Sequence, residues 1–287
     1  MKKIFYSAIP LILLGIPLFL VSCNNPSEKK EKPIALQLYS VRDDMRTDPK
    51  GTLAKVGEIG YPYVEAAGYS NGKFYGMDPL EFKNEVEKDG MVLISSHTGQ
   101  ALPDSEHWDS VMSWWDTCID AHVTAGVKYI VQPFMGQSAY NNLDTLKMYC
   151  DYFNAVGAKC IDKGIKFGYH NHENEFKSID GTRIYDFMLD NTDPAKVFFQ
   201  MDLWWITQGG GDPATYFAKY PGRFLLWHVK DEKELGQSGK IEFAPIFAHA
   251  EEAGVQYYII EVEEYSMAPI ESVRQSFDYL VKSDLIK

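Results

Sequence analysis

Cysteine is scarce in this chain of 287 residues, which contains only four. Three of them, Cys118, Cys150 and Cys160, lie in stretches that we expect to be helical. An odd number of cysteines in predicted helices argues against a disulfide framework, although it leaves a Cys150–Cys160 bond open. We interpret these three residues as buried apolar thiols.

Basic residues are also few, with 28 Lys and Arg against 40 Asp and Glu, and the formal net charge is −12. Residues 1–22 hold two lysines and no acid, so 26 basic and 40 acidic residues give the rest of the chain a net charge of −14. Such an acidic surface repels phosphate backbones, which makes nucleic acid a poor partner. An acidic chain with 14% aromatic residues is compatible with a neutral sugar as substrate.

Long apolar runs are limited to one, from Ile9 to Val21, and prolines and a glycine interrupt it. It is too short to span a membrane comfortably. Lys2 and Lys3 precede it, and Leu20-Val21-Ser22-Cys23 ends it. A basic start, an apolar middle and small residues before a cut are typical of a secretory signal. The ending also resembles a bacterial lipobox, in which the cysteine becomes the lipidated first residue.

We therefore predict a lipoprotein signal peptide over residues 1–22, lipidation of Cys23, a flexible tether over 23–32 and one folded domain over 33–287. The protein would be exported and lipid-anchored to the periplasmic or cell-surface face of a bacterial membrane. Its contact with the membrane would run through the lipid alone. An ordinary signal peptide with an incidental cysteine is the alternative.

Apolar runs and helix-like stretches alternate eight times along the rest of the chain. We predict strands at 34–40, 63–68, 92–97, 128–133, 166–172, 197–203, 224–230 and 257–263. We predict helices at 49–59, 79–89, 107–125, 142–163, 183–189, 213–219, 243–253 and 270–281. Strict alternation of strand and helix predicts a parallel sheet. Eight such units predict an α/β fold of one domain, the (β/α)8 TIM barrel.

A doubly wound open sheet is the alternative architecture. It would need a phosphate-binding glycine loop after an early strand, and the sequence has no GxGxxG or Walker motif there. Gly209-Gly210-Gly211 comes late and has neither spacing, so we interpret it as a flexible loop.

Polar pairs end four consecutive predicted strands, and residues two apart in a strand share a face. The pairs are His170 with His172, Gln200 with Asp202, His228 with Lys230, and Glu261 with Glu263. Packing alone does not explain the set, because each buried polar group costs free energy unless it is paired. Its nitrogen and oxygen donors suit one divalent ion of manganese, cobalt, zinc or iron. We predict four metal ligands: His170, Asp202, His228 and Glu261.

The remaining strand ends face the space left for a substrate. Hydrogen bonds to its hydroxyl groups are expected from Gln37, Glu65, His97, Gln132, Gln200 and Lys230. Gln37 lies in the middle of its predicted strand, so a satisfied core amide is an equal alternative there. Trp204, or its neighbour Trp205, is expected to stack on the sugar. Lys230 could instead pair with Asp231.

Several ordered motifs resemble the sugar phosphate isomerase/epimerase family of xylose-isomerase-like TIM barrels. They are His170-Asn171-His172-Glu173-Asn174-Glu175-Phe176, Gln200-Met201-Asp202-Leu203-Trp204, Gly222-Arg223 with His228-Val229-Lys230-Asp231, and Ile260-Glu261. The resemblance implies a divalent metal, often manganese, that binds the oxygens of a keto sugar. It also implies acidic residues that move a proton beside the carbonyl through a metal-stabilised enediolate.

The chain departs from that pattern at one ligand. In the epimerases the fifth strand supplies a glutamate that also serves as a base, and His170 stands at that place here. Glu261 matches the family's last glutamate and is our first acid/base candidate. Glu175 or His172 would supply the second.

The sequence thus predicts a metal-dependent sugar isomerase or epimerase. One alternative is a metal-dependent lyase or hydrolase that cleaves 3-keto-glycosides by β-elimination. This alternative needs only one base and suits an exported protein, which meets glycosides rather than sugar phosphates. The other alternative is a non-catalytic sugar-binding lipoprotein. The expected partner is a small sugar or keto-glycoside, and a homo-oligomer is compatible with the sequence.

Overall fold

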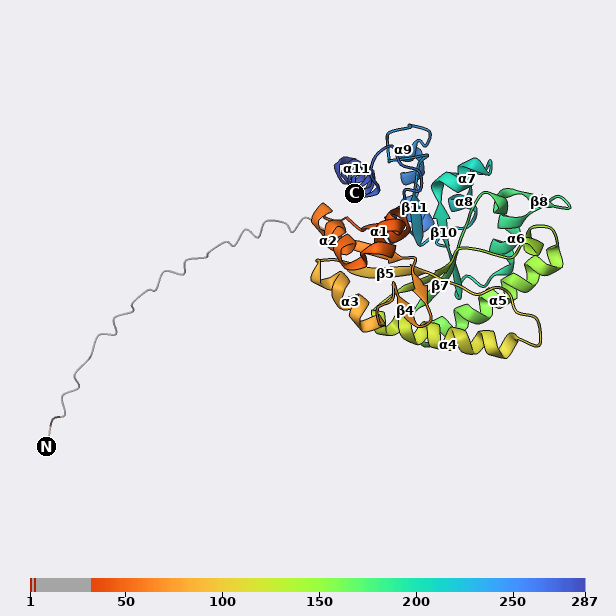
Figure 1. Ribbon diagram of the computed structural model, residues 1–287, viewed down its shortest axis with the longest axis horizontal. Helices are drawn as coiled ribbons and strands as arrows, with labels where there is room; N and C mark the ends of the chain where they lie inside the picture. The colour runs from red at the N-terminus through yellow and green to blue at the C-terminus, as the bar shows by residue number, and fades with distance from the viewer. Residues whose placement is uncertain (2, 4–31, 287) are drawn as a thin grey trace. The chain divides into compact units, whose positions relative to one another are not determined.

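The computed structural model describes residues 1, 3 and 32–286 (Figure 1). The chain divides into two units, residues 1–31 and 32–287. The predicted signal peptide, and Cys23 with nearly all of its tether, lie outside the described residues. Among those that are described, no helix is long and apolar enough to cross a membrane.

Eight parallel strands close into a barrel, which confirms the predicted fold class (Figure 1). Around the barrel they run in the order β1-β12-β11-β10-β7-β6-β5-β2 and back to β1. Their bounds are β1 Ile34–Gln37, β2 Tyr63–Ala66, β5 Val92–His97, β6 Tyr129–Gln132, β7 Lys166–His170, β10 Val197–Asp202, β11 Leu226–Val229 and β12 Tyr257–Ile260. The carboxyl ends of all eight strands therefore meet at one mouth, where the polar residues of the sequence are expected.

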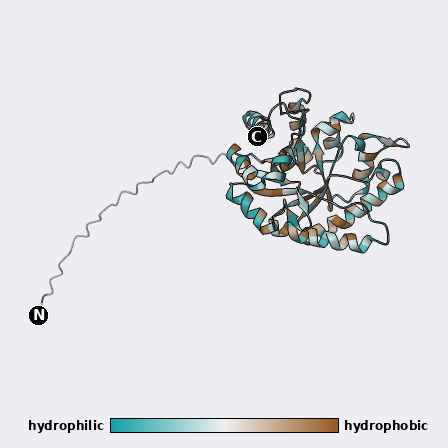
Figure 2. Ribbon diagram, in the orientation of Figure 1, coloured by the Kyte–Doolittle hydropathy of each residue, from teal (hydrophilic) through white to brown (hydrophobic). Residues whose placement is uncertain are grey.

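Helices follow the strands and pack around the barrel. The α-helices are α1 Arg42–Thr47, α2 Pro49–Ile59, α3 Pro79–Lys88, α4 Trp108–Ala125, α5 Leu143–Asp162, α6 Ile184–Asn191, α7 Leu203–Gln208, α8 Pro213–Lys219, α9 Phe243–Phe247, α10 Ala250–Ala253 and α11 Pro269–Lys282. The 3-10 helices are η1 Leu38–Val41, η2 Gln137–Tyr140 and η3 Asn174–Phe176. The α-helices carry both hydrophobic and hydrophilic residues, as expected for helices that pack on one side only (Figure 2).

Two apolar clusters make the core. The larger lies between strands and helices, and Cys118, Cys150 and Cys160 are buried in the chain as free thiols, so the Cys150–Cys160 bond is not formed. The smaller contains Ala35, Ile94, Tyr129, Val131, Phe198, Leu226 and Ile259. Phe198 and Leu226 share strand faces with the site residues two and four positions further on. The smaller cluster thus fills the barrel interior beneath the polar strand ends.

Several predicted strands are shorter in the structure; β7 ends at His170 rather than 172 and β12 at Ile260 rather than 263, so His172 and Glu263 lie beyond their strands. Three further differences are larger. The first strand ends at Gln37 rather than residue 40, because η1 begins there and the Gln37 side chain accepts the N–H of Tyr39. The helix predicted over 243–253 is divided into α9 and α10. Two hairpins are added in the loops, β3 Tyr69–Ser70 with β4 Lys73–Phe74 and β8 Ser178–Ile179 with β9 Thr182–Arg183.

Candidate metal centre

The barrel register brings the four predicted ligands to neighbouring strand ends. His170 ends β7 and pairs with Gln200 of β10, while Asp202 ends β10 and pairs with His228 of β11. Glu261 directly follows β12. Asp202 also caps helix α7, because its Oδ1 accepts the N–H of Trp205 at 2.8 Å. That bond fixes the side chain and leaves Oδ2 to face the other three.

Asp202, His228 and Glu261 form a buried group whose ligand atoms all lie within 4.8 Å of one another. Nδ1 of His228 lies 3.2 Å from Oε2 of Glu261 and 3.9 Å from Oδ2 of Asp202. This Asp202 oxygen is buried and has no hydrogen-bond partner. A buried carboxylate oxygen without a hydrogen bond costs free energy. A bound cation would offset that cost, so this oxygen is a candidate ligand atom.

His170 lies beside this group on the neighbouring strand, but the group within 4.8 Å does not include it. Its Nε2 lies 4.0 Å from Oδ2 of Asp202. Its Nδ1 lies 3.1 Å from Oε1 of Gln200, an amide oxygen that can only accept. The proton of a neutral His170 therefore sits on Nδ1, and Nε2 keeps a lone pair directed toward Asp202. Two imidazoles and two carboxylates match the donor set of manganese, cobalt, zinc or iron, so the residues present fit such an ion.

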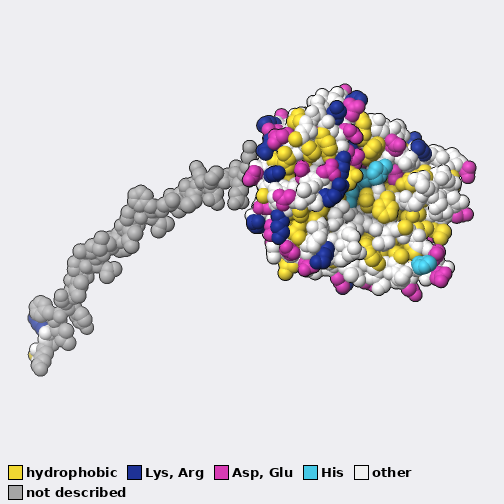
Figure 3. All heavy atoms as spheres, in the orientation of Figure 1, with side chains coloured by type: hydrophobic (Ala, Val, Ile, Leu, Met, Phe, Trp, Pro, Cys, Tyr) yellow, Lys and Arg dark blue, Asp and Glu magenta, His cyan; other side chains and the backbone are white. Residues whose placement is uncertain are grey.

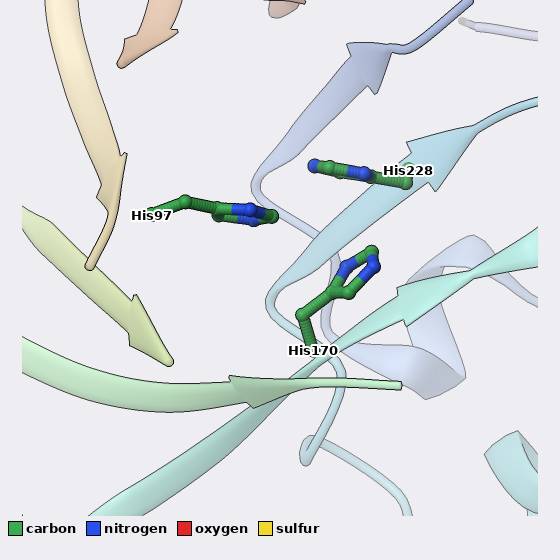
Figure 4. A group of neighbouring side chains, drawn as sticks. All are labelled: His97, His170 and His228. Carbon is green, nitrogen blue, oxygen red and sulfur yellow. The ribbon is translucent and has the colours of Figure 1, made fainter. Parts of the chain in front are cut away.

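A second group of possible ligands, His97, His170 and His228, overlaps the first (Figure 4). The rings of His97 and His228 are parallel, with centroids 5.1 Å apart. The inward nitrogens of this group already have partners, since Nε2 of His97 lies 2.6 Å from Oε1 of Gln200. Nε2 of His228 lies 2.7 Å from Oε1 of Glu65. The group containing the unpartnered Asp202 oxygen is therefore the better cation site.

Gln37, Glu65 and Gln200 form a fully buried polar layer inside the barrel. Gln37 donates to Oε1 of Glu65 at 2.7 Å, and Gln200 donates to Oε2 of Glu65 at 2.8 Å. The substrate contacts predicted for these three residues stay a prediction. In this structure their polar atoms bond to one another and to the histidines.

The pKa values of the two carboxylates are shifted in opposite directions, although burial acts to raise both. Burial raises the pKa of Asp202 to about 6, since Lys230 offsets it only in part and Glu261 adds to it. Burial alone would raise the pKa of Glu261 too, but Lys230 and His228 outweigh it and hold this pKa well below its usual range. Lys230 lies 3.1 Å from Oε2 of Glu261 and 3.9 Å from Oδ2 of Asp202. Glu261 is therefore ionised at neutral pH.

The two histidines predicted as ligands also differ in charge. Burial lowers the pKa of His170 well below its usual range, with further lowering from His228, so His170 is neutral. Burial alone would lower the pKa of His228, but Glu261 and Glu65 raise it to about 10. Without a cation, His228 therefore carries a proton on Nδ1 as well as on Nε2.

Glu175 lies apart from this cluster, in η3. Its buried carboxylate accepts hydrogen bonds from the hydroxyls of Tyr140 and Tyr169 and from the backbone N–H of His172. These contacts hold the turn that presents His172, whose ring centroid lies 4.9 Å from that of His170. The direct acid/base role predicted for Glu175 stays a prediction.

Three further residues named by the sequence prediction, Gln132, Trp204 and Trp205, lie at or just beyond strand ends. Gln132 donates to the carbonyl oxygens of Gln100 and Phe134, and its own Oε1 is buried without a partner. Trp204 packs against the larger core cluster. The ring of Trp205 instead makes a cation–π contact, because the Nζ atom of Lys230 lies 4.9 Å from its centroid.

The sequence identifies Glu263 only as a strand-end partner of Glu261. In the structure it lies 3.0 Å from Lys230, the residue for which the sequence predicts a pairing with Asp231 or with a substrate oxygen. The spacing of two residues after Glu261 is the available signal, because both carboxylates would share a face if the strand ran on to residue 263, although β12 ends at Ile260.

Two exposed aromatic side chains follow strands β1 and β6. Tyr39 follows β1 and is 44% exposed, and Phe134 follows β6 and is 43% exposed. On the face seen in Figure 3, histidine side chains are visible among hydrophobic and charged ones. Exposed rings beside a polar cluster offer the flat apolar surface on which a sugar ring can stack.

The sequence matches the family model of the xylose isomerase-like TIM barrel over residues 53–283, and the protein belongs to this family. A structure of a sugar phosphate isomerase/epimerase from Parabacteroides distasonis is 33% identical. The match covers 90% of this chain and 100% of that one, with a TM-score of 0.83.

More distant relatives include two kinds of enzyme. An inosose dehydratase of Geobacillus thermodenitrificans is 23% identical over 253 residues, which cover 75% of this chain and 82% of the relative. An L-ribulose 3-epimerase structure superposes with a TM-score of 0.68 at 12% identity, covering 88% of this chain and 94% of that one. At that identity the likeness concerns the fold alone. The relatives named by sequence are thus a sugar phosphate isomerase/epimerase and inosose dehydratases, and an enzyme acting on a small sugar is the class to which this chain points.

Proposed function

We propose that this protein is a divalent-metal-dependent enzyme that removes a proton from the carbon beside the keto group of a sugar, as an isomerase or epimerase does. The observation that carries the proposal is the unpartnered Oδ2 of Asp202, which faces His170, His228 and Lys230 at 3.9 to 4.0 Å. Together with Glu261, the two histidines and Asp202 would hold the ion, which would act as a Lewis acid toward the carbonyl and hydroxyl oxygens of the sugar.

Glu261 is our candidate for the base. Its contacts with His228 and Lys230 use Oε2, so Oε1 is the oxygen that we assign to the proton of the substrate. The low pKa of Glu261 keeps it ionised and able to accept a proton at neutral pH. His172 is the candidate for the second acid or base, because its ring centroid lies 4.9 Å from that of His170 and 5.9 Å from that of Trp205.

We infer a sugar without phosphate as the substrate. Lys230 is buried at the strand ends and is already paired with Glu261 and Glu263. The net charge of the chain disfavours an anionic ligand. The exposed ring of Phe134 suits a neutral sugar instead, while the ring of Tyr39 already has the Arg42 guanidinium 4.8 Å from its centroid. Manganese is the ion we expect, with cobalt, zinc or iron as alternatives.

A second candidate function is β-elimination from a keto sugar or 3-keto-glycoside. His170 favours it, since it occupies the place where a two-glutamate epimerase has its second carboxylate. Elimination needs one base and a leaving group on the next carbon. The similarity to inosose dehydratases also favours it, because their name describes loss of water from a keto compound.

Solvent deuterium exchange tests the proposed function. The purified protein, loaded with Mn²⁺, is incubated in D₂O with free ketohexoses and with 3-keto-glucosides. We expect deuterium at the carbon beside the carbonyl, and we expect a chelator to abolish the exchange. Release of the aglycone would assign the elimination. Sugar binding without exchange in every case would refute the enzymatic proposal.

We also propose that the protein is exported and anchored through a lipid on Cys23. The support is the order of the first 23 residues, from the two lysines to the lipobox-like Leu20-Val21-Ser22-Cys23. In a bacterial host, the full chain should incorporate labelled palmitate and sediment with membranes. Cys23→Ser should lose both properties, while Cys118→Ser, which changes a buried thiol of the barrel, should keep them. Labelling that survives Cys23→Ser would contradict the anchor.

A further inference from the structure

We propose that Glu65 is the positioning residue that sets the proton pattern of both histidine ligands, so that their free lone pairs meet at Asp202. Glu65 lies on β2 and is fully buried, while His228 lies on β11. This inference rests on the metal site of the proposed function and gives Glu65 a task other than holding substrate.

Glu65 acts on His228 through a direct hydrogen bond, which we call the first branch. Oε1 of Glu65 lies 2.7 Å from Nε2 of His228. A carboxylate only accepts, so the Nε2 of His228 must carry a proton. Nδ1 is then the nitrogen that can ligate an ion, and it faces Glu261 and Asp202 at 3.2 and 3.9 Å. A carboxylate on the far nitrogen of a metal-binding histidine fixes its tautomer and raises its basicity.

The second branch runs through the amide of Gln200. Its Nε2 donates to Oε2 of Glu65 at 2.8 Å, which turns its Oε1 toward the histidines. That oxygen accepts from Nδ1 of His170 at 3.1 Å. The lone pair of His170 is therefore on Nε2, the nitrogen that lies 4.0 Å from Oδ2 of Asp202.

Glu65→Gln is a sharp test because an amide of the same shape cannot satisfy both branches. If its NH₂ group faces Gln200, two donors meet and the Gln200 amide must turn over, which moves the proton of His170 to Nε2. If its NH₂ group faces His228, that histidine must accept on Nε2 and places its proton on Nδ1. Either arrangement removes one lone pair from the metal site.

Loss of the negative charge of Glu65 in Glu65→Gln should also weaken metal affinity. A divalent ion adds positive charge to the site. The negative carboxylate of Glu65 stabilises that charge, and the neutral amide in Glu65→Gln does not. Loss of such an outer partner typically weakens metal affinity about 10- to 100-fold.

The experiment measures Mn²⁺ affinity by titration calorimetry at one pH, together with unfolding of the chelator-treated proteins. We expect Glu65→Gln to weaken Mn²⁺ binding about 10- to 100-fold. Gln37→Met is the matched control, since Gln37 donates to the same Glu65 oxygen but has no hydrogen bond to either histidine ligand. It should change affinity less than about threefold even where it lowers stability.

A second variant keeps the test decisive if Glu65→Gln does not fold. Gln200→Met breaks the branch to His170, together with the contact of Gln200 to His97, and leaves the bond of Glu65 to His228. We expect about a tenfold loss of affinity. Nitrogen-15 NMR of the Zn²⁺-loaded protein provides a further readout, with protons on Nε2 of His228 and Nδ1 of His170. If both variants bound Mn²⁺ as tightly as the wild type, the proposed role of Glu65 would be wrong, but the proposed function would stand. A wild-type protein that binds no ion would instead overturn the proposed function.

Discussion

Asp202→Asn is expected to lose at least about 100-fold in affinity for Mn²⁺, more than the loss of an outer partner costs. The substituted amide keeps an oxygen that can cap α7 through Trp205 N–H. It removes the negative charge from the unpartnered Oδ2, which is the atom that we assign to the ion. Calorimetric titration of the chelator-treated protein measures the loss, and His228→Ala should lose the ion as well.

Asp212→Asn is the matched control for this prediction. Asp212 caps α8 through the N–H groups of Ala214 and Thr215, as Asp202 caps α7, but it is exposed. Its variant should bind Mn²⁺ like the wild type. Full occupancy in Asp202→Asn would contradict the ligand set.

The affinity for Mn²⁺ should also rise steeply with pH. The pKa of His228 is raised to about 10, so below that pH its Nδ1 proton must leave before the ion can bind. Each pH unit between about 6 and 10 should therefore improve the dissociation constant about tenfold. Below about 6 Asp202 is protonated too, and the slope should approach a hundredfold per unit.

Calorimetry in two buffers of different ionisation enthalpy gives an independent count. About one proton should be released for each ion bound near pH 7.5. His228 also links pH to the stability of the metal-free protein. Its raised pKa contributes stability that is complete below pH 6.5 and is lost as pH rises through about 10. A metal affinity that does not change with pH would show that His228 is not a ligand.

The closed barrel could be predicted because its signals are local. Apolar runs recur eight times along the chain, and several of the intervening helices end at a glycine, such as the left-handed Gly60 and Gly126. The two added hairpins also have a local signal that the prediction does not use. Asn71-Gly72 and Asp180-Gly181 all have positive φ, as the tight turns of two-residue hairpins require.

The site could be predicted in part for the same reason. Alternation along a strand places His228 and Glu261 toward the barrel interior, and the register then brings them together. Alternation does not tell which inward residues bond to each other. The contact of Glu65 with His228 joins positions 163 residues apart, and the proton pattern depends on how the Gln200 amide is turned. Those facts require coordinates.

Pulsed electron paramagnetic resonance of the Mn²⁺-loaded protein tests the central claim most directly. One ion per chain is expected, with nitrogen-14 couplings from the two imidazoles of His170 and His228. The couplings should weaken to those of one histidine in His170→Gln, if the ion is retained. A stoichiometric ion that shows no nitrogen coupling, or no stoichiometric uptake at all, would contradict the metal centre at the ends of β7, β10, β11 and β12.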